Sequence, residues 1–207
     1  EKKTELVIAG GDGAGLVAAI QAAAEGLDPA SIRIIAPGST LGEDMENMAP
    51  YVNAYNTQEQ FDEGIEDDFE IYLADTVAAG ENTGRQEMAS YLVENGEMAV
   101  DWIRETLGIE LGAISQQEGS SVARSYPAAE GNLNEKVRSA MTDKIEELGI
   151  EVTYNAEVTK AAYNEEGILE SVTIVTEDGE ETLPCTALVA TDLALLPVFE
   201  NSQVYEN

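Results

Sequence analysis

Histidine is missing from the 207-residue sequence, and cysteine occurs only once, as Cys185. Without histidine, these residues cannot supply an imidazole base or an imidazole metal ligand. A single cysteine excludes an internal disulfide, a CxxC redox pair and a zinc site made of thiolates. We expect Cys185, at the edge of an apolar run, to be a small buried hydrophobe.

Positive charge is scarce, because 10 lysines and arginines stand against 41 acidic residues and give a formal net charge of −31. Such a chain repels phosphate backbones and anionic lipid, so we expect no nucleic acid partner and no membrane surface. The acids are spread over nearly every segment, which is typical of a solvated surface; adaptation to high salt is a second interpretation. No loop has the spacing of an EF-hand calcium site.

Long apolar runs are also missing. The longest, residues 187–199, is interrupted by Asp192 and Pro197 and is too short to predict a membrane-spanning helix. No signal peptide is recognisable, and a start at Glu1 instead of methionine indicates a trimmed N-terminus, which leaves the compartment open. Because 43% of the residues are apolar, the chain can bury a core, and we expect one domain over residues 1–207.

The first 36 residues have the pattern of a βαβ unit. An apolar run at residues 6–9 enters the glycine-rich stretch 10–15, an alanine-rich helical pattern covers residues 16–25, and a second apolar run covers residues 31–36. A strand, a glycine turn, a helix and a second strand predict a crossover between parallel strands.

Further along the chain, the hydrophobic period changes from helical to strand-like. The predicted helices cover residues 69–79, 88–107 and 132–148, with residues 39–64 and 115–130 as loops. The predicted strands cover residues 150–154, 158–163, 168–176, 181–184 and 187–190, with hairpin turns between the first four. This order predicts an α/β fold, namely a Rossmann-like FAD-binding fold with a parallel sheet, a helical insertion and a β-meander.

The glycine-rich turn is the candidate binding site. In a GxGxxG turn the first glycine makes the tight turn, the second lets the backbone approach a pyrophosphate, and the third lets the helix pack on the strand. Gly10 and Gly15 hold the first and third positions here, but Asp12 holds the second. A carboxylate there adds a side chain where none fits and repels a diphosphate by roughly 4 kcal/mol at a separation of about 4 Å. Ala36 replaces the expected ribose-binding acid, so the local residues leave nucleotide binding and a plain strand-to-helix turn equally open.

Six segments carry a family resemblance: LVIAGGDGAGLVAAIQAAAEG, GIEDDFEIYLADTVAAG, MASYLVENGEMAVDWIRETLGIELG, GSSVARSYPAAEG, LGIEVTYNAEVTKAAYNEEGILESVTI and ALVATD. In this order and spacing they resemble the flavoprotein family of fumarate reductase, succinate dehydrogenase, urocanate reductase and ketosteroid dehydrogenase, particularly the soluble flavocytochrome-type reductases. The resemblance covers nearly all of the chain. It implies that FAD carries hydride between an electron source and an activated C=C bond.

The resemblance also implies where FAD binds. The pyrophosphate would lie at the glycine turn, Val158 would contact adenine through its backbone, and the end of the last strand would pass near the phosphates. The implied cofactor-binding residues are Gly10, Gly11, Asp12, Gly13, Ala14, Gly15, Ala36, Val158, Ala190 and Thr191. No catalytic residue and no metal ligand is assigned.

The chain departs from the family pattern in several segments. The last strand continues into Asp192 where the family has glycine, the flavin loop at residues 42–48 has acids and methionines in place of glycines, and the family's Arg-x-His segment reads Arg124-Ser125-Tyr126. In the family, a capping domain supplies the substrate and proton-donating arginines, and a C-terminal segment completes the flavin site. We expect residues 1–207 to lack both and to be inactive alone.

Two hypotheses remain open. In the first, the domain is degenerate: it keeps the fold but has lost flavin binding and catalysis, because changes at Asp12, Ala36, residues 43–46 and Asp192 surround one diphosphate site. In the second, it is a functional FAD-dependent oxidoreductase domain that a cap domain or a partner chain completes. A cap, a partner chain or a second copy of the chain would cover the open flavin face.

Several side chains have competing interpretations. If the domain has lost FAD, the carboxylates of Asp12, Glu43, Asp44 and Asp192 could hold a cation in the former flavin pocket, or they form a solvated acidic rim. Arg124 is either a substrate-carboxylate ligand, by its family position, or a surface or domain-contact residue. Tyr126 could donate a proton, although a phenol with the ordinary pKa of about 10 is a poor acid for this step. Trp102, Met88 and Met98 are expected to pack between helices.

Overall fold

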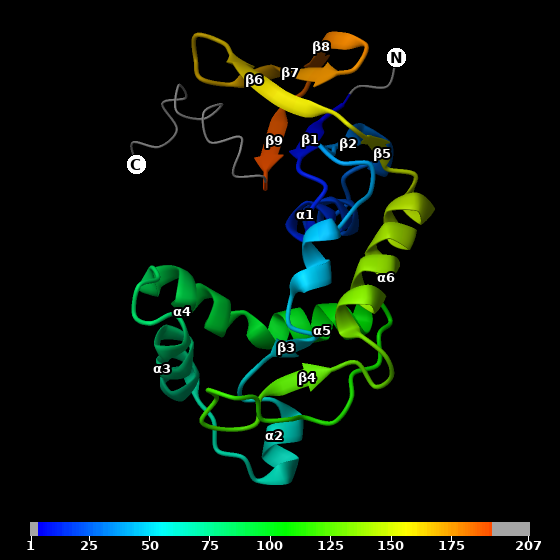
Figure 1. The fold of residues 1–207 in the computed structure, drawn as a ribbon. Coiled ribbons are helices and arrows are strands. Elements are labelled where there is room, and N and C mark those ends of the chain that lie inside the picture. Colours follow the sequence, from blue (N-terminus) through cyan, green and yellow to red (C-terminus); the bar gives the residue numbers. More distant parts are fainter. Residues whose placement is uncertain (1–3, 192–207) are drawn as a thin grey trace. The chain divides into compact units, whose positions relative to one another are not determined.

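The computed structural model describes residues 4–191 (Figure 1). These residues divide into two compact units, one formed by the chain up to residue 47 together with the chain from residue 138 onward, and the other by residues 48–137. The expectation of one domain over residues 1–207 stays a prediction. Among the helices of residues 4–191, none is long and apolar enough to cross a membrane.

Four parallel strands form the centre of the first unit. They are β1 (Leu6–Ala9), β2 (Ile32–Ile35), β5 (Glu151–Thr153) and β9 (Ala187–Ala190), in the order β5-β2-β1-β9. Helix α1 (Gly13–Ala24) and the 3₁₀ turn η1 (Pro29–Ser31) connect β1 to β2. Every residue of β1 is buried, as expected for an aliphatic strand that is covered on both faces. The predicted α/β fold class is confirmed.

A three-stranded antiparallel meander follows β5. Its strands are β6 (Glu157–Tyr163), β7 (Leu169–Thr176) and β8 (Gly179–Pro184), in that order (Figure 1). Val158 and Ile174 of the meander share one buried cluster with Val7 and Ile35 of the parallel sheet, which joins the two sheets. Cys185 belongs to the same cluster and is buried, as predicted; burial raises the pKa of its thiol.

The hairpin predicted around residue 155 is wrong. Strand β5 pairs with β2 in the parallel sheet, and Asn155, with a φ of 50°, leads the chain from there into β6. A strand at the edge of a parallel sheet and a strand of a hairpin share the period of two, so the pattern does not separate them. Helix α6 (Leu133–Leu148) precedes β5 and buries Met141 and Ile145.

The second unit is mainly helical. Its helices are α2 (Gln58–Glu63), α3 (Phe69–Ala79), α4 (Gln86–Glu94) and α5 (Gly96–Glu105), and its small antiparallel sheet pairs β3 (Tyr51–Asn53) with β4 (Ser125–Pro127). One buried cluster gathers Ala54, Val100 and Tyr126, and another gathers Tyr72, Leu73 and Val93.

The two predicted loops, residues 39–64 and 115–130, contain regular structure and are corrected here. The 3₁₀ helix η2 (Glu43–Asn47), β3 and α2 lie in the first, and β4 lies in the second. Strands of three residues are too short to show a period, and β3 finds its partner far along the chain. The start of α2 did carry a readable signal, because Thr57 and Gln60 form a capping box.

The single helix predicted over residues 88–107 is in fact two helices, α4 and α5, separated by Asn95. Helix α5 begins at Gly96, where a Cβ would lie 2.6 Å from the carbonyl oxygen of Asn53, so this position requires glycine. The packing role expected for Met88 and Met98 is also wrong, since their side chains are 67% and 61% exposed.

Gly15 sets how closely α1 approaches the end of β1, because a Cβ at this position would lie 2.3 Å from the carbonyl oxygen of Gly10. We expect Gly15→Ala to lower the free energy of unfolding by about 1–3 kcal/mol, since the strand must move to admit the methyl group. Urea denaturation measures the change. The matched control is Gly84→Ala, where nothing lies within 4 Å and the change should stay below about 0.5 kcal/mol. Equal effects would contradict the close contact.

Candidate functional site

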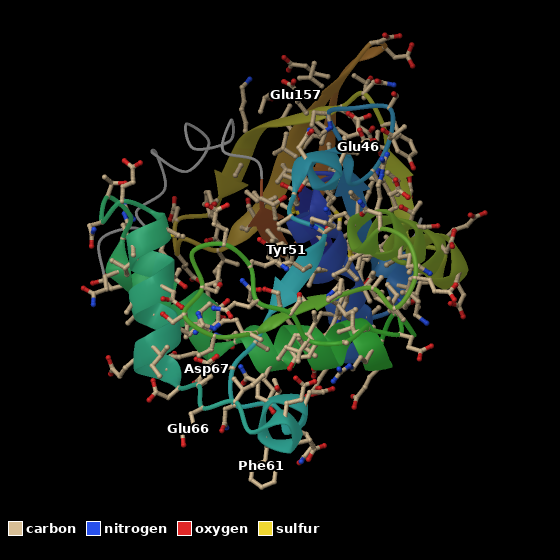
Figure 2. The ribbon with its side chains drawn as sticks, turned by 60° about the horizontal axis from the view of Figure 1, so that its bottom comes forward. Glu46, Tyr51, Phe61, Glu66, Asp67 and Glu157 are labelled. Carbon is tan, nitrogen blue, oxygen red and sulfur yellow. The ribbon has the colours of Figure 1, made fainter. Side chains whose placement is uncertain are left out.

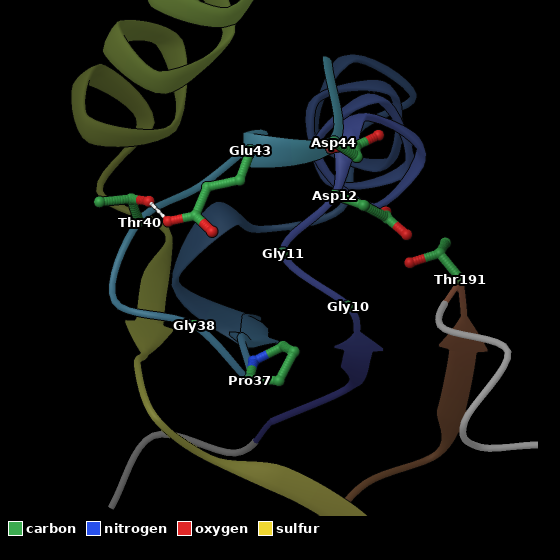
Figure 3. Close-up of a pocket in the computed structure, with 9 residues that line it drawn as sticks. All are labelled: Gly10, Gly11, Asp12, Pro37, Gly38, Thr40, Glu43, Asp44 and Thr191. Atoms are coloured by element: carbon green, nitrogen blue, oxygen red, sulfur yellow. Dashed lines mark hydrogen bonds between the residues drawn. The ribbon is translucent and has the colours of Figure 1, made fainter. Parts of the chain in front are cut away.

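The glycine turn leads from the end of β1 into the first turn of α1 (Figure 3). Gly10 has a φ of 140°, a conformation that glycine adopts readily. Asp12 is the N-cap of α1, and its Oδ1 accepts a hydrogen bond from the amide of Gly15 at 2.8 Å. The carboxylate therefore folds over the first turn of its own helix, and the expectation that it leaves no room for a diphosphate stays a prediction.

A second carboxylate reaches the same helix end. Asp44, in η2, accepts hydrogen bonds from the amide of Gly13 at 3.1 Å through Oδ1 and at 3.3 Å through Oδ2. The start of a helix carries partial positive charge, which a carboxylate stabilises. Asp12 and Asp44 together take two of the amide donors that a bound phosphate would use.

Backbone and side-chain contacts hold η2 against the turn. Gly42, in the left-handed region at a φ of 67°, donates a hydrogen bond to the carbonyl oxygen of Gly11 at 2.7 Å. Arg138 of α6 donates from Nε to the carbonyl oxygen of Leu41 at 2.9 Å and forms an ion pair with Glu46. These contacts fix the loop that carries Asp44.

An open cavity of about 370 Å³ lies beyond the carboxyl ends of β1, β2 and β9 (Figure 3). Its lining residues are Gly10, Gly11, Asp12, Pro37, Gly38, Thr40, Glu43, Asp44 and Thr191. Ligands of open α/β sheets bind at this edge. The charged side chains in the lining are all carboxylates, and Glu43 accepts a hydrogen bond from the hydroxyl of Thr40.

The structure brings most of the predicted binding residues to this cavity. Those that line it are Gly10, Gly11, Asp12 and Thr191, and those beside the lining are Gly13, Ala14, Gly15 and Ala190. Ala36 is fully buried, and a Cβ on Gly11 would lie 2.8 Å from the Cβ of Ala36, so this position offers the ribose no carboxylate. Val158 is not in the lining, and its side chain is buried in the core that joins the sheets. Its expected backbone contact with adenine stays a prediction.

Pro37, Gly38 and Thr40 line the cavity but were not predicted. The signal that could have found them is the Pro-Gly pair that follows β2 after Ala36, at the same edge of the sheet as the glycine turn. Asp192 lies outside the described residues. Within residues 4–191, no group of three histidine, cysteine, aspartate or glutamate side chains is placed to hold a metal ion, so the cation interpretation gains no support there.

Arg124 lies in the second unit and is fully buried. Its guanidinium binds both carboxylate oxygens of Asp67 at 2.9 Å and Oδ2 of Asp75 at 2.6 Å, and its Cζ lies 4.6 Å from the centre of the Tyr72 ring. Burial opposes the charge, but the two carboxylates outweigh it and raise the pKa of Arg124. The prediction of a surface or domain-contact residue is wrong, and a side chain with no exposed area does not meet a substrate.

Tyr126 is also fully buried, and its hydroxyl is hydrogen-bonded to the hydroxyl of Thr57. Burial raises the pKa of this phenol, which makes it a weaker acid than a free tyrosine. Ser125 is buried and donates a hydrogen bond to Oδ1 of Asn53 at 2.6 Å. The segment from Arg124 to Tyr126 is therefore part of the core of the second unit.

A parallel sheet whose first strand passes through a glycine turn into a helix N-terminus is typical of dinucleotide-binding proteins. Comparison with known families narrows this class, because the model of the FAD binding domain family matches residues 5–178. The chain belongs to this family of FAD-binding domains. The resemblance to fumarate-reductase-like flavoproteins is confirmed, and FAD is the cofactor that the match supports.

Known relatives are fumarate reductases and are much longer. The chain is 31% identical to NADH:fumarate oxidoreductase of Klebsiella pneumoniae over 158 residues, which are 76% of this chain and 17% of that protein. It is 24% identical to the fumarate reductase (cytochrome) of Shewanella frigidimarina over 82% of this chain and 29% of that protein. The fold matches the open conformation of a flavocytochrome c3 fumarate reductase with a TM-score of 0.78, at 21% identity, over 92% of this chain and 33% of the other.

The described residues keep the backbone of a dinucleotide site, but two of its amide donors are engaged with carboxylates. The turn at Gly10 and the close contact at Gly15 are those that a diphosphate site needs. The amides of Gly13 and Gly15, however, are hydrogen-bonded to Asp44 and Asp12. A diphosphate needs such amides and carries negative charge of its own, so the arrangement of these side chains does not fit it.

Replacing Arg124 tests how much the buried ion network stabilises the second unit. We expect Arg124→Met to lower the free energy of unfolding by about 3–5 kcal/mol, because it leaves the carboxylates of Asp67 and Asp75 without their cation. Chemical denaturation measures the loss. Arg85→Met, at an exposed arginine, is the control and should change stability by less than about 0.5 kcal/mol. A small loss in both variants would show that the network contributes little.

Asp75 makes the stability of this network depend on pH. Burial would raise the pKa of its carboxyl, but hydrogen bonds from Ser121 and Arg124 outweigh burial and lower it. A lowered folded-state pKa means that the contribution is fully present above the unfolded value of about 3.9 and is lost as the pH falls through the folded value. We expect the stability difference between wild type and Asp75→Asn to be constant from neutral pH to about pH 5 and to shrink below about pH 4. Urea titrations at each pH measure it, and a constant difference throughout would contradict the lowered pKa.

Proposed function

We propose that the chain is an FAD-binding-type domain of a fumarate-reductase-like flavoprotein in which the protein's own carboxylates close the diphosphate site, so that it neither retains FAD nor catalyses by itself. The observation that carries the proposal is the pair of hydrogen bonds from Gly15 to Asp12 and from Gly13 to Asp44. Both use amides at the start of α1, where the family places the cofactor's pyrophosphate.

Charge adds to this competition for donors. Each phosphate of FAD would approach two carboxylates at the helix start, and a like-charge pair about 4 Å apart costs roughly 4 kcal/mol near a protein surface. Glu43 adds a third carboxylate to the cavity lining, and among residues 4–191 no lysine or arginine lines it. The missing acid at Ala36 removes the contact that would hold the ribose.

A second candidate function is favoured by a different observation. The glycine backbone at Gly10 and the Gly15 contact are intact, and the relatives are fumarate reductases of which this chain spans 17% and 29%. In this alternative the domain, single over residues 1–207, binds FAD and reduces an activated C=C bond once a cap domain or a partner chain completes it. The ten residues implied by the family would then be the FAD contacts, and Asp44 would leave the amide of Gly13 when FAD binds.

Restoring the site tests the proposal directly. We expect purified wild-type protein to lose added FAD on desalting and to show no rise in melting temperature with FAD. Asp12→Gly combined with Asp44→Ala should bind FAD at least about tenfold more tightly than wild type, because both amides are freed and two charges are removed. Isothermal titration and the flavin absorption band measure binding. Glycine at an N-cap costs only a few tenths of a kcal/mol, so the variant should fold.

Two single substitutions separate the causes. Asp44→Asn removes the charge but keeps an oxygen that can accept from Gly13, whereas Asp44→Ala removes both. If charge dominates, the two variants gain equally; if occupation of the amide dominates, only Asp44→Ala gains. Glu25→Gln, at the opposite end of α1, is the control and should change nothing. A wild-type protein that keeps its flavin band after desalting would overturn the closed site and favour the second candidate.

A further inference from the structure

Asp44 meets the start of α1 from a segment that is distant in sequence. Its carboxylate and the amide of Gly13 are 31 residues apart in the chain, and the hydrogen bonds between them, at 3.1 and 3.3 Å, are open to solvent. Water competes for both groups, so such a bond adds little net stability. Asp12, in contrast, lies three residues from Gly15 and caps its own helix. The position of Asp44 therefore depends on what holds its segment, residues 41–46.

Arg138 contacts this segment on both sides of Asp44. Its Nε donates a hydrogen bond to the carbonyl oxygen of Leu41 at 2.9 Å, and its Nη1 forms an ion pair with Glu46. The stem of the side chain lies against Gly42, since a Cβ on that glycine would lie 3.1 Å from Cγ of Arg138. One side chain thus reaches the segment at three positions.

Helix α6 gives Arg138 a packed base. The helix buries Met141 and Ile145, which are 1% and 3% exposed and lie three and seven residues beyond Arg138. Residues at such spacings share one face of a helix, so Arg138 projects from the buried side of α6. Its contacts therefore tie the 41–46 segment to a helix that is packed in the core.

The other contacts of the segment come from the glycine turn itself. Gly42 donates a hydrogen bond to the carbonyl oxygen of Gly11 at 2.7 Å. The sulfur of Met45 lies against Gly13, where a Cβ would be 3.2 Å from it. These contacts align Asp44 with the amide of Gly13, while Arg138 connects the segment to the rest of the unit.

We propose that Arg138 is the positioning residue of the closed site: it holds the 41–46 segment against the glycine turn and so keeps the carboxylate of Asp44 on the amide of Gly13. Without its guanidinium, the segment moves away from the turn, and the amide is left for another acceptor, such as a phosphate oxygen. A contact that can be released then closes the site. The inference rests on the proposed function, because it explains how that closure is maintained.

The sign of the expected effect separates this role from a charge effect. Arg138 is not among the residues that line the cavity. Loss of a cation ordinarily weakens the binding of an anion through the field of the whole protein. Loss of Arg138 should instead strengthen the binding of FAD, because it releases a carboxylate from the diphosphate site.

Amide hydrogen exchange tests the position of Asp44 without a ligand. The first four amides of a helix have no partner within it, so the protection of Gly13 and Gly15 reports on the carboxylates that they bind. We expect Arg138→Met, which keeps an apolar stem, to speed exchange at Gly13 by about fivefold or more and to leave Gly15 unchanged. NMR of protein labelled isotopically in glycine measures both amides.

Two further variants are matched to this test. Lys144→Met removes the same charge from the same helix, at a lysine that is also ion-paired, and should change neither amide. Glu46→Gln breaks the ion pair but leaves the hydrogen bond from Arg138 to Leu41, so its effect should lie between those of wild type and Arg138→Met. Glu46 is labelled in Figure 2, and its side chain is 63% exposed, so this substitution leaves the core intact.

Isothermal titration with FAD links the contact to the site. Arg138→Met should bind FAD about fivefold more tightly than wild type, which is the gain expected from freeing one amide. In an Asp44→Ala background the same substitution should bring no further gain, since the carboxylate that Arg138 positions is absent. Circular dichroism shows that each variant is folded.

Three results would overturn the inference. They are unchanged exchange at Gly13, equal acceleration at Gly13 and Gly15, which would be a general loosening of the turn, and an Arg138→Met variant that gains no affinity although Asp44→Ala does. Failure of the proposed function has a different signature, because wild-type protein would then keep FAD on desalting. Exchange at Gly13 would still measure whether Arg138 positions Asp44.

Discussion

Helix α1 lies against the end of β1 only because Gly15 has no side chain, since a single added carbon would overlap the carbonyl oxygen of Gly10. This contact aims the first turn of the helix at the carboxyl edge of the parallel sheet, where the cavity opens. The amides at that end are strong donors with partial positive charge. Whatever occupies them, a cofactor's phosphates or the chain's own carboxylates, decides what the domain can bind.

In this chain carboxylates occupy two of them, the amides of Gly13 and Gly15. Asp12 caps its own helix, and Asp44 arrives on a loop that Gly42 and Arg138 hold in place. Such contacts stabilise the empty fold while they oppose a diphosphate. A family fold whose diphosphate site is closed by the chain's own carboxylates, as we propose, is therefore physically consistent, because fold and site depend on different atoms of the same turn.

The second unit depends on a different constraint. Arg124, with no exposed area, holds Asp67 and Asp75 and stacks on Tyr72, while Gln60 donates to Asp67 and to the carbonyl oxygen of Ala123. A buried charge is tolerated only when its partners are complete. This requirement explains why Arg124, whose family position suggested a substrate ligand, instead holds together the core of the second unit.

The sequence alone determined the α/β class, the parallel βαβ start and the meander, because these follow from hydrophobic period and from the order of glycine turns, both of which are local. The family came from the resemblance of six segments in their order and spacing. The sequence also identified Asp12 as the residue that departs from the glycine pattern of the turn. Tertiary structure decided what that anomaly does: Asp44 is 31 residues from Gly13 in sequence, yet it meets the amide of Gly13 at the helix start. The short β3–β4 pairing, the burial of Arg124 and the exposure of Met88 likewise depend on contacts between distant segments, which no local pattern encodes.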